Sequence, residues 1–228
     1  MLPCMAAGAW VRFYFAARAA RFRFRGVRPS QGASVQVEGA APLRILLAGA
    51  GLAAGYSVRT HDEGLAGALA SAVGKESGRG VRVDLRVAPT LAARNAVELL
   101  GPNGSHTYDL AVFAPCFLEA NFAPGAGMPR HGAEIQRHLL ETGSDRLTVV
   151  MVGIPRPTRY SLLNVRATEA ASETNRAMRL NARDDPRVIV VEPPEFESID
   201  SSDPFDQRYH AELGRRIADA LPALGRRA

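Results

Sequence analysis

The fold of this chain is decided by residues 43–58, which read Leu-Arg-Ile-Leu-Leu-Ala-Gly-Ala-Gly-Leu-Ala-Ala-Gly-Tyr-Ser-Val. The first six residues are apolar except for Arg44 and predict a buried β-strand, and the next seven predict a glycine-rich turn at the end of this strand. In open α/β sheets, ligands bind and catalytic groups lie beside turns of this kind, at the carboxyl edge of the sheet. We therefore expect the functional site of the protein at this turn.

Further apolar runs follow along the chain, and segments of helical composition separate them. The runs are 81–85, 109–114, 147–153 and 187–192. Helices are expected after residue 60 and over about 90–100, 131–142, 165–183 and 206–221. Strands that alternate with helices indicate βαβ units. The sequence therefore predicts an α/β fold, a three-layer α/β/α sandwich whose five-stranded parallel sheet has the flavodoxin-like order 2-1-3-4-5.

The first of these helices has a recognisable start. Residues 60–63 read Thr-His-Asp-Glu, which is the Ser/Thr-x-x-Glu pattern of a capping box. Leu65, Leu69 and Val73 follow at helical spacing and share one face. We expect a helix that begins at the box and buries these three side chains.

Length and charge divide the chain into two parts. A chain of 228 residues fits one domain with a sizeable core. The net charge is +5, but residues 1–37 hold six arginines and no acid, whereas residues 38–228 hold 22 basic and 23 acidic residues. The globular part is therefore almost neutral, and we expect no nucleic-acid partner. We predict a basic N-terminal extension and linker over 1–41 and one folded domain over 42–228, with residues 29–41 as the linker.

The N-terminal segment, residues 1–28, mixes small and aromatic residues with arginines. Its arginine-free start lacks the basic region and long apolar core of a signal peptide. No apolar run in it approaches the roughly 18 residues that a membrane-spanning helix needs. We expect a cytoplasmic protein with a docking or poorly ordered extension. The alternative is a peripheral membrane contact, made by an arginine-rich amphipathic helix on an anionic surface.

Cysteine and histidine usage gives no sign of a metal site or a disulfide. The two cysteines, Cys4 and Cys116, lie in different contexts, and no His/Cys spacing typical of a metal site occurs. Cys116 is expected to be a small buried hydrophobic residue. We expect neither a metal nor another cofactor.

The strand and turn at 43–55 resemble the first block of the SGNH (GDSL-type) hydrolases, a strand followed by Gly-Asp-Ser-x-x-x-Gly. In that family the serine of this block is the nucleophile. The three corresponding positions here are Gly49, Ala50 and Gly51, so the nucleophile position carries no side chain. Acyl transfer needs an oxygen or sulfur nucleophile beside a base. The resemblance covers about residues 43–221 and implies the same three-layer fold.

The resemblance also implies positions for the oxyanion hole and the base. The family's Gly-x-Asn-Asp corresponds to residues 116–119, Cys-Phe-Leu-Glu, where Leu118 cannot donate a hydrogen bond in place of the asparagine. The loop after the second strand, 86–90, contains no glycine to add a second donor. The family's Asp-x-x-His corresponds to Asp203-Pro-Phe-Asp206, so Asp206 stands where the base is expected.

The resemblance thus implies an ester hydrolase, while the residues predict impaired or absent catalysis. Loss of a nucleophile or its base typically lowers kcat by about 10⁶. A crevice at the edge of the sheet would remain, and it would hold a small acyl or sugar-ester ligand in a non-catalytic protein, a pseudoenzyme. The candidate pocket residues are Gly49, Gly51, Cys116, Phe117 and Leu118.

Two other interpretations stay open. In the first, Ser57 and His210 replace the nucleophile and base of an esterase, together with Asp203 or Asp206; the ordinary expectation for His210 is a histidine on the surface of a helix. In the second, the turn is a dinucleotide-binding fingerprint, because it also matches Gly-x-Gly-x-x-Ala over 49–54. The acidic residue that this fingerprint expects about 20 residues later is absent from that window.

Overall fold

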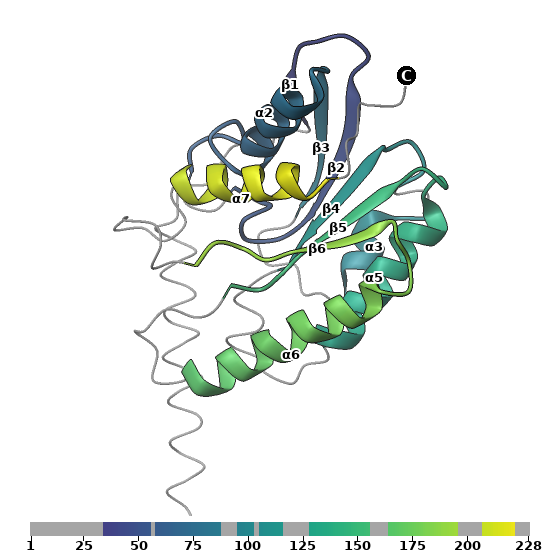
Figure 1. The fold of residues 1–228 in the computed structure, drawn as a ribbon, viewed down its shortest axis with the longest axis vertical. Coiled ribbons are helices and arrows are strands. Elements are labelled where there is room, and N and C mark those ends of the chain that lie inside the picture. Colours follow the sequence, from purple (N-terminus) through teal and green to yellow (C-terminus); the bar gives the residue numbers. More distant parts are fainter. Residues whose placement is uncertain are drawn as a thin grey trace, which may run out of the picture.

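The computed structural model describes residues 34–55, 58–87, 95–102, 105–115, 128–155, 164–195 and 207–221. Its centre is a six-stranded sheet in the order β1-β3-β2-β4-β5-β6 (Figure 1). Five of these strands are parallel, and their order confirms the predicted arrangement 2-1-3-4-5. The parallel strands are β2 (Leu43–Gly49), β3 (Val81–Val87), β4 (Leu110–Ala114), β5 (Thr148–Val152) and β6 (Val188–Val191).

The sixth strand, β1 (Ser34–Val37), lies at the edge of the sheet and pairs antiparallel with β3. The prediction of a linker over 29–41 is therefore wrong for these four residues. Val35 is 6% exposed and belongs to the hydrophobic core on the face of the sheet that carries Leu43, Ile45 and Leu47. Ser34 and Gln36 are exposed. Four residues give too short an alternation to identify a strand, and its partner β3 lies more than forty residues further along the chain.

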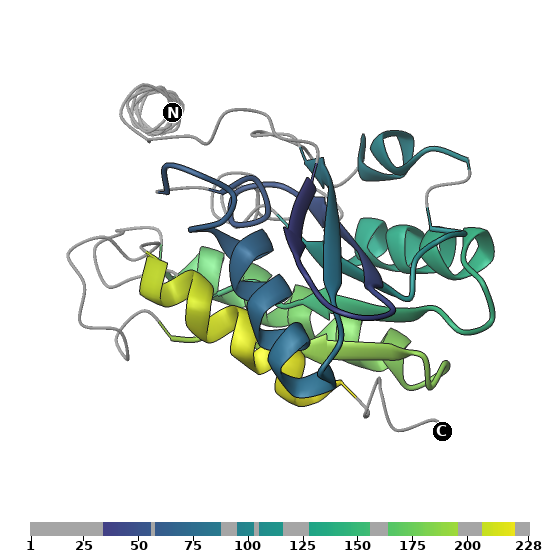
Figure 2. The same ribbon diagram turned by 90° about the horizontal axis from the view of Figure 1, so that it is seen from above.

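Helices cover both faces of the sheet, as predicted (Figure 2). On one face α2 (Leu65–Ser77) and α7 (Gln207–Ala220) pack against each other and against the odd-numbered side chains of β2. On the other face lie α3 (Ala96–Leu100), α5 (Met128–Thr142) and α6 (Asn164–Ala182). Because both faces are covered, β2 and β4 are buried along almost their whole length.

The predicted capping box forms in a turn that precedes the helix, and it does not cap the helix itself. The Glu63 N–H donates to Thr60 Oγ1 at 3.3 Å, and the Glu63 carboxylate accepts from the Arg59 N–H at 3.0 Å. Helix α2 begins only at Leu65, after Gly64 as its N-cap, so the expected start of the helix was wrong by one turn. The buried face was right, because Leu65, Leu69 and Val73 are at most 2% exposed.

None of the described helices is long and apolar enough to cross a membrane. Residues 1–28, for which a peripheral membrane contact is one expectation, lie outside the described residues.

Candidate functional site

The carboxyl edge of the sheet has its switch point between β2 and β4. From β2 the chain first connects to β3 on one side, and β4, β5 and β6 then extend the sheet on the other side. Crevices in open α/β sheets form where the connections diverge in this way, outside the carboxyl ends of the strands. The turn that follows β2 stands at this point, which is where the sequence predicts the site.

Gly49 ends β2 in direct contact with the backbone of β4. Its φ is +130°, and a Cβ built on it would lie 1.9 Å from the Ala114 carbonyl oxygen. The next residue, Ala50, donates its N–H to the same oxygen at 3.1 Å. A side chain at position 49 would therefore collide with β4, and glycine is required here for packing whatever the chemistry of the site.

Gly51, at the nucleophile position implied by the resemblance, is buried and has a φ of +57°. L-residues other than glycine adopt this left-handed conformation at a cost of about 1–2 kcal/mol. Successive turns follow: the Ala53 N–H donates to the Ala50 carbonyl at 3.2 Å, and the Gly55 N–H donates to the Leu52 carbonyl at 3.1 Å. This position therefore has no nucleophile, and its backbone conformation favours glycine.

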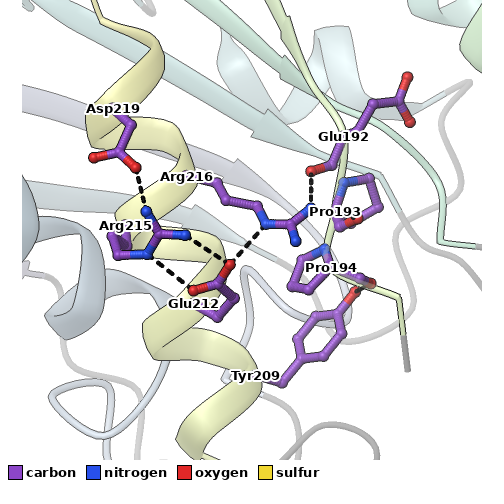
Figure 3. Close-up of polar contacts among 8 residues, drawn as sticks. All are labelled: Glu192, Pro193, Pro194, Tyr209, Glu212, Arg215, Arg216 and Asp219. Atoms are coloured by element: carbon purple, nitrogen blue, oxygen red, sulfur yellow. Dashed lines mark hydrogen bonds and ion pairs between the residues drawn. The ribbon is translucent and has the colours of Figure 1, made fainter. Parts of the chain in front are cut away.

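Side chains of α7 hold the segment that leaves β6, Glu192–Pro194 (Figure 3). The Tyr209 hydroxyl donates to the Pro194 carbonyl at 3.2 Å, and Arg216 Nη1 donates to the carbonyls of Glu192 and Pro193 at 3.5 and 3.4 Å. Three successive carbonyls thus find partners on the helix. Tyr209 is fully buried, which raises the pKa of its hydroxyl and keeps it a donor.

Arg216 is itself held by Glu212, one turn earlier in α7, through a 2.8 Å hydrogen bond. Arg215 hydrogen-bonds the same carboxylate at 2.9 Å (Figure 3). Hydrogen bonds from the two arginines lower the pKa of Glu212 to about 2, and their positive charges act in the same direction. The carboxylate therefore stays ionised and keeps Arg216 aimed at the end of β6.

Asn175 of α6 holds the neighbouring strand end in a similar way. The Ile154 N–H donates to Asn175 Oδ1 at 2.7 Å, and Asn175 Nδ2 donates to the Ile154 carbonyl at 2.9 Å. The side chain is only 7% exposed, so these two bonds satisfy the backbone just after β5 where water has little access. Neither Asn175 nor the α7 contacts were predicted from the sequence. For the α7 contacts, the available signal was the pair of prolines at 193 and 194, which provide carbonyls without N–H groups.

His210 is fully buried, and the expectation of a histidine on the helix surface is wrong. It lies one turn before Gly214 on the buried side of α7. Gly214 approaches α2 so closely that a Cβ on it would lie 2.8 Å from the Ala68 carbonyl carbon. Residues four apart share a helical face, so His210 lies on the side of α7 that faces α2. The apolar spacing of this helix, with Leu213 and Ile217 on the same side, was the signal for its burial.

No protein-family model matches the chain, and no curated protein does. Solved structures do match it. The lipase Lip_vut3 from a goat rumen metagenome is 14% identical, with 81% of this chain and 98% of that chain covered and a TM-score of 0.61. TesA is 17% identical, with coverages of 79% and 97% and a TM-score of 0.56. A protein assigned to the SGNH hydrolases, from Slackia heliotrinireducens, is 12% identical, with coverages of 79% and 100% and a TM-score of 0.53.

The chain has the SGNH-hydrolase fold. At identities of 12–17% the likeness establishes the architecture, and the chemistry has to be argued from the residues of this chain.

Within the SGNH-hydrolase fold, the described part of the chain contains three of the predicted site positions. Gly49 and Gly51 lie at the switch point, and His210 lies in α7. The other predicted positions lie outside the described residues, and their roles stay predictions. These are Ser57, Cys116, Phe117, Leu118, Asp203 and Asp206. Within the described ranges, no group of three or more His, Cys, Asp or Glu side chains is arranged to hold a metal ion.

The connection between β2 and α2 differs from a dinucleotide-binding turn. In the fingerprint, the glycines lead directly into a helix whose N-terminus meets the pyrophosphate. Here residues 51–55 and 59–64 form turns and bends, and α2 begins only at Leu65. Asp84, the acid on β3, lies opposite Leu46 in the middle of its strand, away from the carboxyl end, and accepts hydrogen bonds from Arg82 and Tyr108. This geometry gives the dinucleotide interpretation no support.

Proposed function

We propose that this protein binds a small acyl-ester or sugar-ester ligand at the carboxyl edge of its sheet and does not hydrolyse it efficiently. The ligand class is suggested by the SGNH-hydrolase fold and by two structural relatives that are a lipase and an aryl esterase. The single observation that carries the loss of catalysis is Gly51, which stands at the nucleophile position without a side chain and in a left-handed conformation.

Impaired catalysis follows from the chemical needs of acyl transfer. A covalent acyl intermediate needs an attacking oxygen or sulfur, and position 51 supplies neither. Removal of a nucleophile or its base lowers kcat by about 10⁶, and the residual rate depends on the oxyanion hole and on binding. By the resemblance to the SGNH hydrolases, Leu118 and Asp206 stand at the oxyanion and base positions, and neither matches the asparagine or histidine of that family.

Retained binding is supported by contacts that hold the strand ends and do not involve position 51. The glycine contact between Gly49 and Ala114 fixes the switch point, and the contacts of Tyr209 and Arg216 fix the segment after β6. These features maintain the strand ends around the crevice independently of a nucleophile. Binding pockets are usually preformed in this manner, with mostly apolar walls and a few polar groups.

Hydrolysis of p-nitrophenyl butyrate by the purified full chain tests the proposed loss of catalysis. We expect a rate equal to that of buffer. Ser57→Ala and His210→Gln are compared with Ser71→Ala and His106→Gln, which change an exposed serine and an exposed histidine. Because His210 is fully buried, thermal unfolding must also show that His210→Gln remains folded. A clear rate that Ser57→Ala or His210→Gln abolishes and the matched controls retain would show an esterase with relocated catalytic residues.

Thermal unfolding with added methyl butyrate, methyl octanoate or glucose pentaacetate tests the proposed binding of an ester. A ligand at about 100 times its Kd stabilises the folded state by about 2.7 kcal/mol, a shift of about 5–10 °C for a domain of this size. Gly51→Asn should abolish the shift, because asparagine tolerates a positive φ and places an amide in the crevice. Gly78→Asn, at an exposed left-handed helix C-cap, is the matched control. Absence of any shift, together with absence of hydrolysis, would contradict the proposal.

A further inference from the structure

Two consecutive backbone N–H groups in the turn after β2 find no acceptor among the described residues. The N–H groups on either side of them are bonded: Ala50 donates to the Ala114 carbonyl at 3.1 Å, and Ala53 donates to the Ala50 carbonyl at 3.2 Å. Between these, the N–H groups of Gly51 and Leu52 bond to no carbonyl or side chain in the part of the chain that the structure describes. Both residues are buried. Because a buried N–H without an acceptor is costly, these two donors call for a ligand.

The backbone at this point has the alternation that forms an anion-binding nest. Ala50 has a negative φ, and Gly51 has a φ of +57°. A change of sign of this kind turns successive N–H groups toward one concavity, where they bind an anion. Two adjacent donors match a ligand that offers two acceptor oxygens and a negative charge. A carboxylate has this chemistry.

The residues of the turn suit the alkyl part of a ligand. Ala50, Leu52 and Ala53 are buried apolar residues, and Val58, after the next turn, is buried too. Gly51 adds no side chain beside the two donors. Apolar walls with a small number of polar groups are typical of pockets for small organic ligands. These surroundings favour an alkyl carboxylate over inorganic phosphate.

Arg86 adds a positive charge at the same edge of the sheet. It pairs with Ala48, one residue before the Gly49 that ends β2. Its side chain is exposed, and none of the described acids forms an ion pair with it. Asp84, the acid two residues earlier on β3, is paired with other arginines. A guanidinium in this place raises the local concentration of anions.

We propose that the N–H groups of Gly51 and Leu52 bind the carboxylate of a free acyl acid, so that the site takes the acid more tightly than its ester. This inference rests on the proposed function, because it places the ligand at the same edge of the sheet. Hydrogen bonds to a charged oxygen are about twice as strong as those to a neutral carbonyl. With two such bonds, octanoate should bind about 10-fold more tightly than methyl octanoate.

Isothermal titration calorimetry of the full chain with octanoate and with methyl octanoate, which share one alkyl chain, measures this preference. Amide NMR spectra of the same chain locate the site. Octanoate should shift the amide signals of Gly51 and Leu52 and leave that of Gly78 in place, because the Gly78 N–H already donates to the Gly74 carbonyl at 2.9 Å.

Arg86→Gln should weaken octanoate binding about two- to four-fold and leave methyl octanoate unchanged, since only the acid is charged. Arg215→Gln is the matched control and should change neither affinity. It removes an arginine that is 58% exposed, on α7 at the opposite face of the sheet. Thermal unfolding without ligand checks that both variants are folded. Unchanged octanoate affinity in Arg86→Gln would overturn the electrostatic part of the inference.

The remaining outcomes separate this inference from the proposed function. Equal or tighter binding of methyl octanoate would overturn the inference and leave the proposed function standing. Binding of octanoate alone would support the inference and remove the ester as a ligand. Octanoate binding without a shift at Gly51 and Leu52 would overturn the site, and tighter binding of inorganic phosphate would overturn the ligand class. Binding of neither octanoate nor its ester would overturn both proposals.

Discussion

Substitution of Gly49 by alanine should destabilise the protein far more than an ordinary Gly→Ala change. The new Cβ would lie 1.9 Å from the Ala114 carbonyl oxygen, so β2 and β4 have to separate at the carboxyl edge. Strain at a φ of +130° costs about 2 kcal/mol. Separation also breaks the 3.1 Å bond from the Ala50 N–H to Ala114, and leaving these groups buried without partners costs about 2 kcal/mol more. We expect a loss of about 3–4 kcal/mol, once the lower entropy of the unfolded alanine chain is included.

Urea denaturation of Gly49→Ala beside Gly78→Ala measures this difference. Gly78 has a φ of +66° but nothing within 4 Å of its Cβ position, so its substitution should cost only about 1 kcal/mol of backbone strain. In thermal unfolding, the Gly49 variant should lose about 10 °C. Equal losses in the two variants would refute the reasoning, because β2 and β4 would then not meet at Gly49. The crevice that the proposed function places there would lose its structural basis.

Gly51→Ser should lose about 1–2 kcal/mol to left-handed strain and still hydrolyse p-nitrophenyl butyrate no faster than buffer, because the base and oxyanion residues are not restored. An efficient Gly51→Ser enzyme would show that those residues lie elsewhere. Tyr209→Phe removes the buried donor to the Pro194 carbonyl and should cost about 1–2 kcal/mol in urea denaturation; an unchanged midpoint would contradict the assigned contact. Glu212 ionises with a pKa of about 2 instead of 4.5, so it stabilises the folded state above pH 4.5 and that contribution is lost as the pH falls toward 2. Glu212→Gln should flatten the pH dependence of stability in that window. An unchanged profile would show that the folded state does not lower the pKa of Glu212.

The main architecture followed from local sequence patterns. Apolar runs of strand length alternated with helical segments, which fixed five parallel strands in the order 2-1-3-4-5. The helical spacing of Leu65, Leu69 and Val73 gave the buried face of α2 correctly. These features depend on continuous apolar runs and on a period of 3.6 residues, which a sequence displays directly.

The errors arose where a distant contact decides local structure. Strand β1 forms because Val35 finds a place in the core and its backbone pairs with β3. The Thr60–Glu63 box forms its hydrogen bond, but the helix begins one turn later, at Leu65. His210 is buried because α7 packs against α2 at Gly214. For β1 the energy comes from a partner remote in sequence, which a pattern of four residues does not reveal, whereas the apolar spacing of α7 already indicated the burial of His210.

The sequence by itself determined that Gly51 has no nucleophilic side chain, since the identity of a residue does not depend on the fold. It also determined the fold class, because parallel strands that are buried on both faces of a sheet appear in the sequence as continuous apolar runs. Only the tertiary structure decided why Gly49 is a glycine, since the carbonyl that excludes a side chain belongs to a strand more than sixty residues further along the chain. It also decided which side chains hold the chain just after β5 and β6, because Asn175, Tyr209 and Arg216 act on carbonyls brought near them by folding.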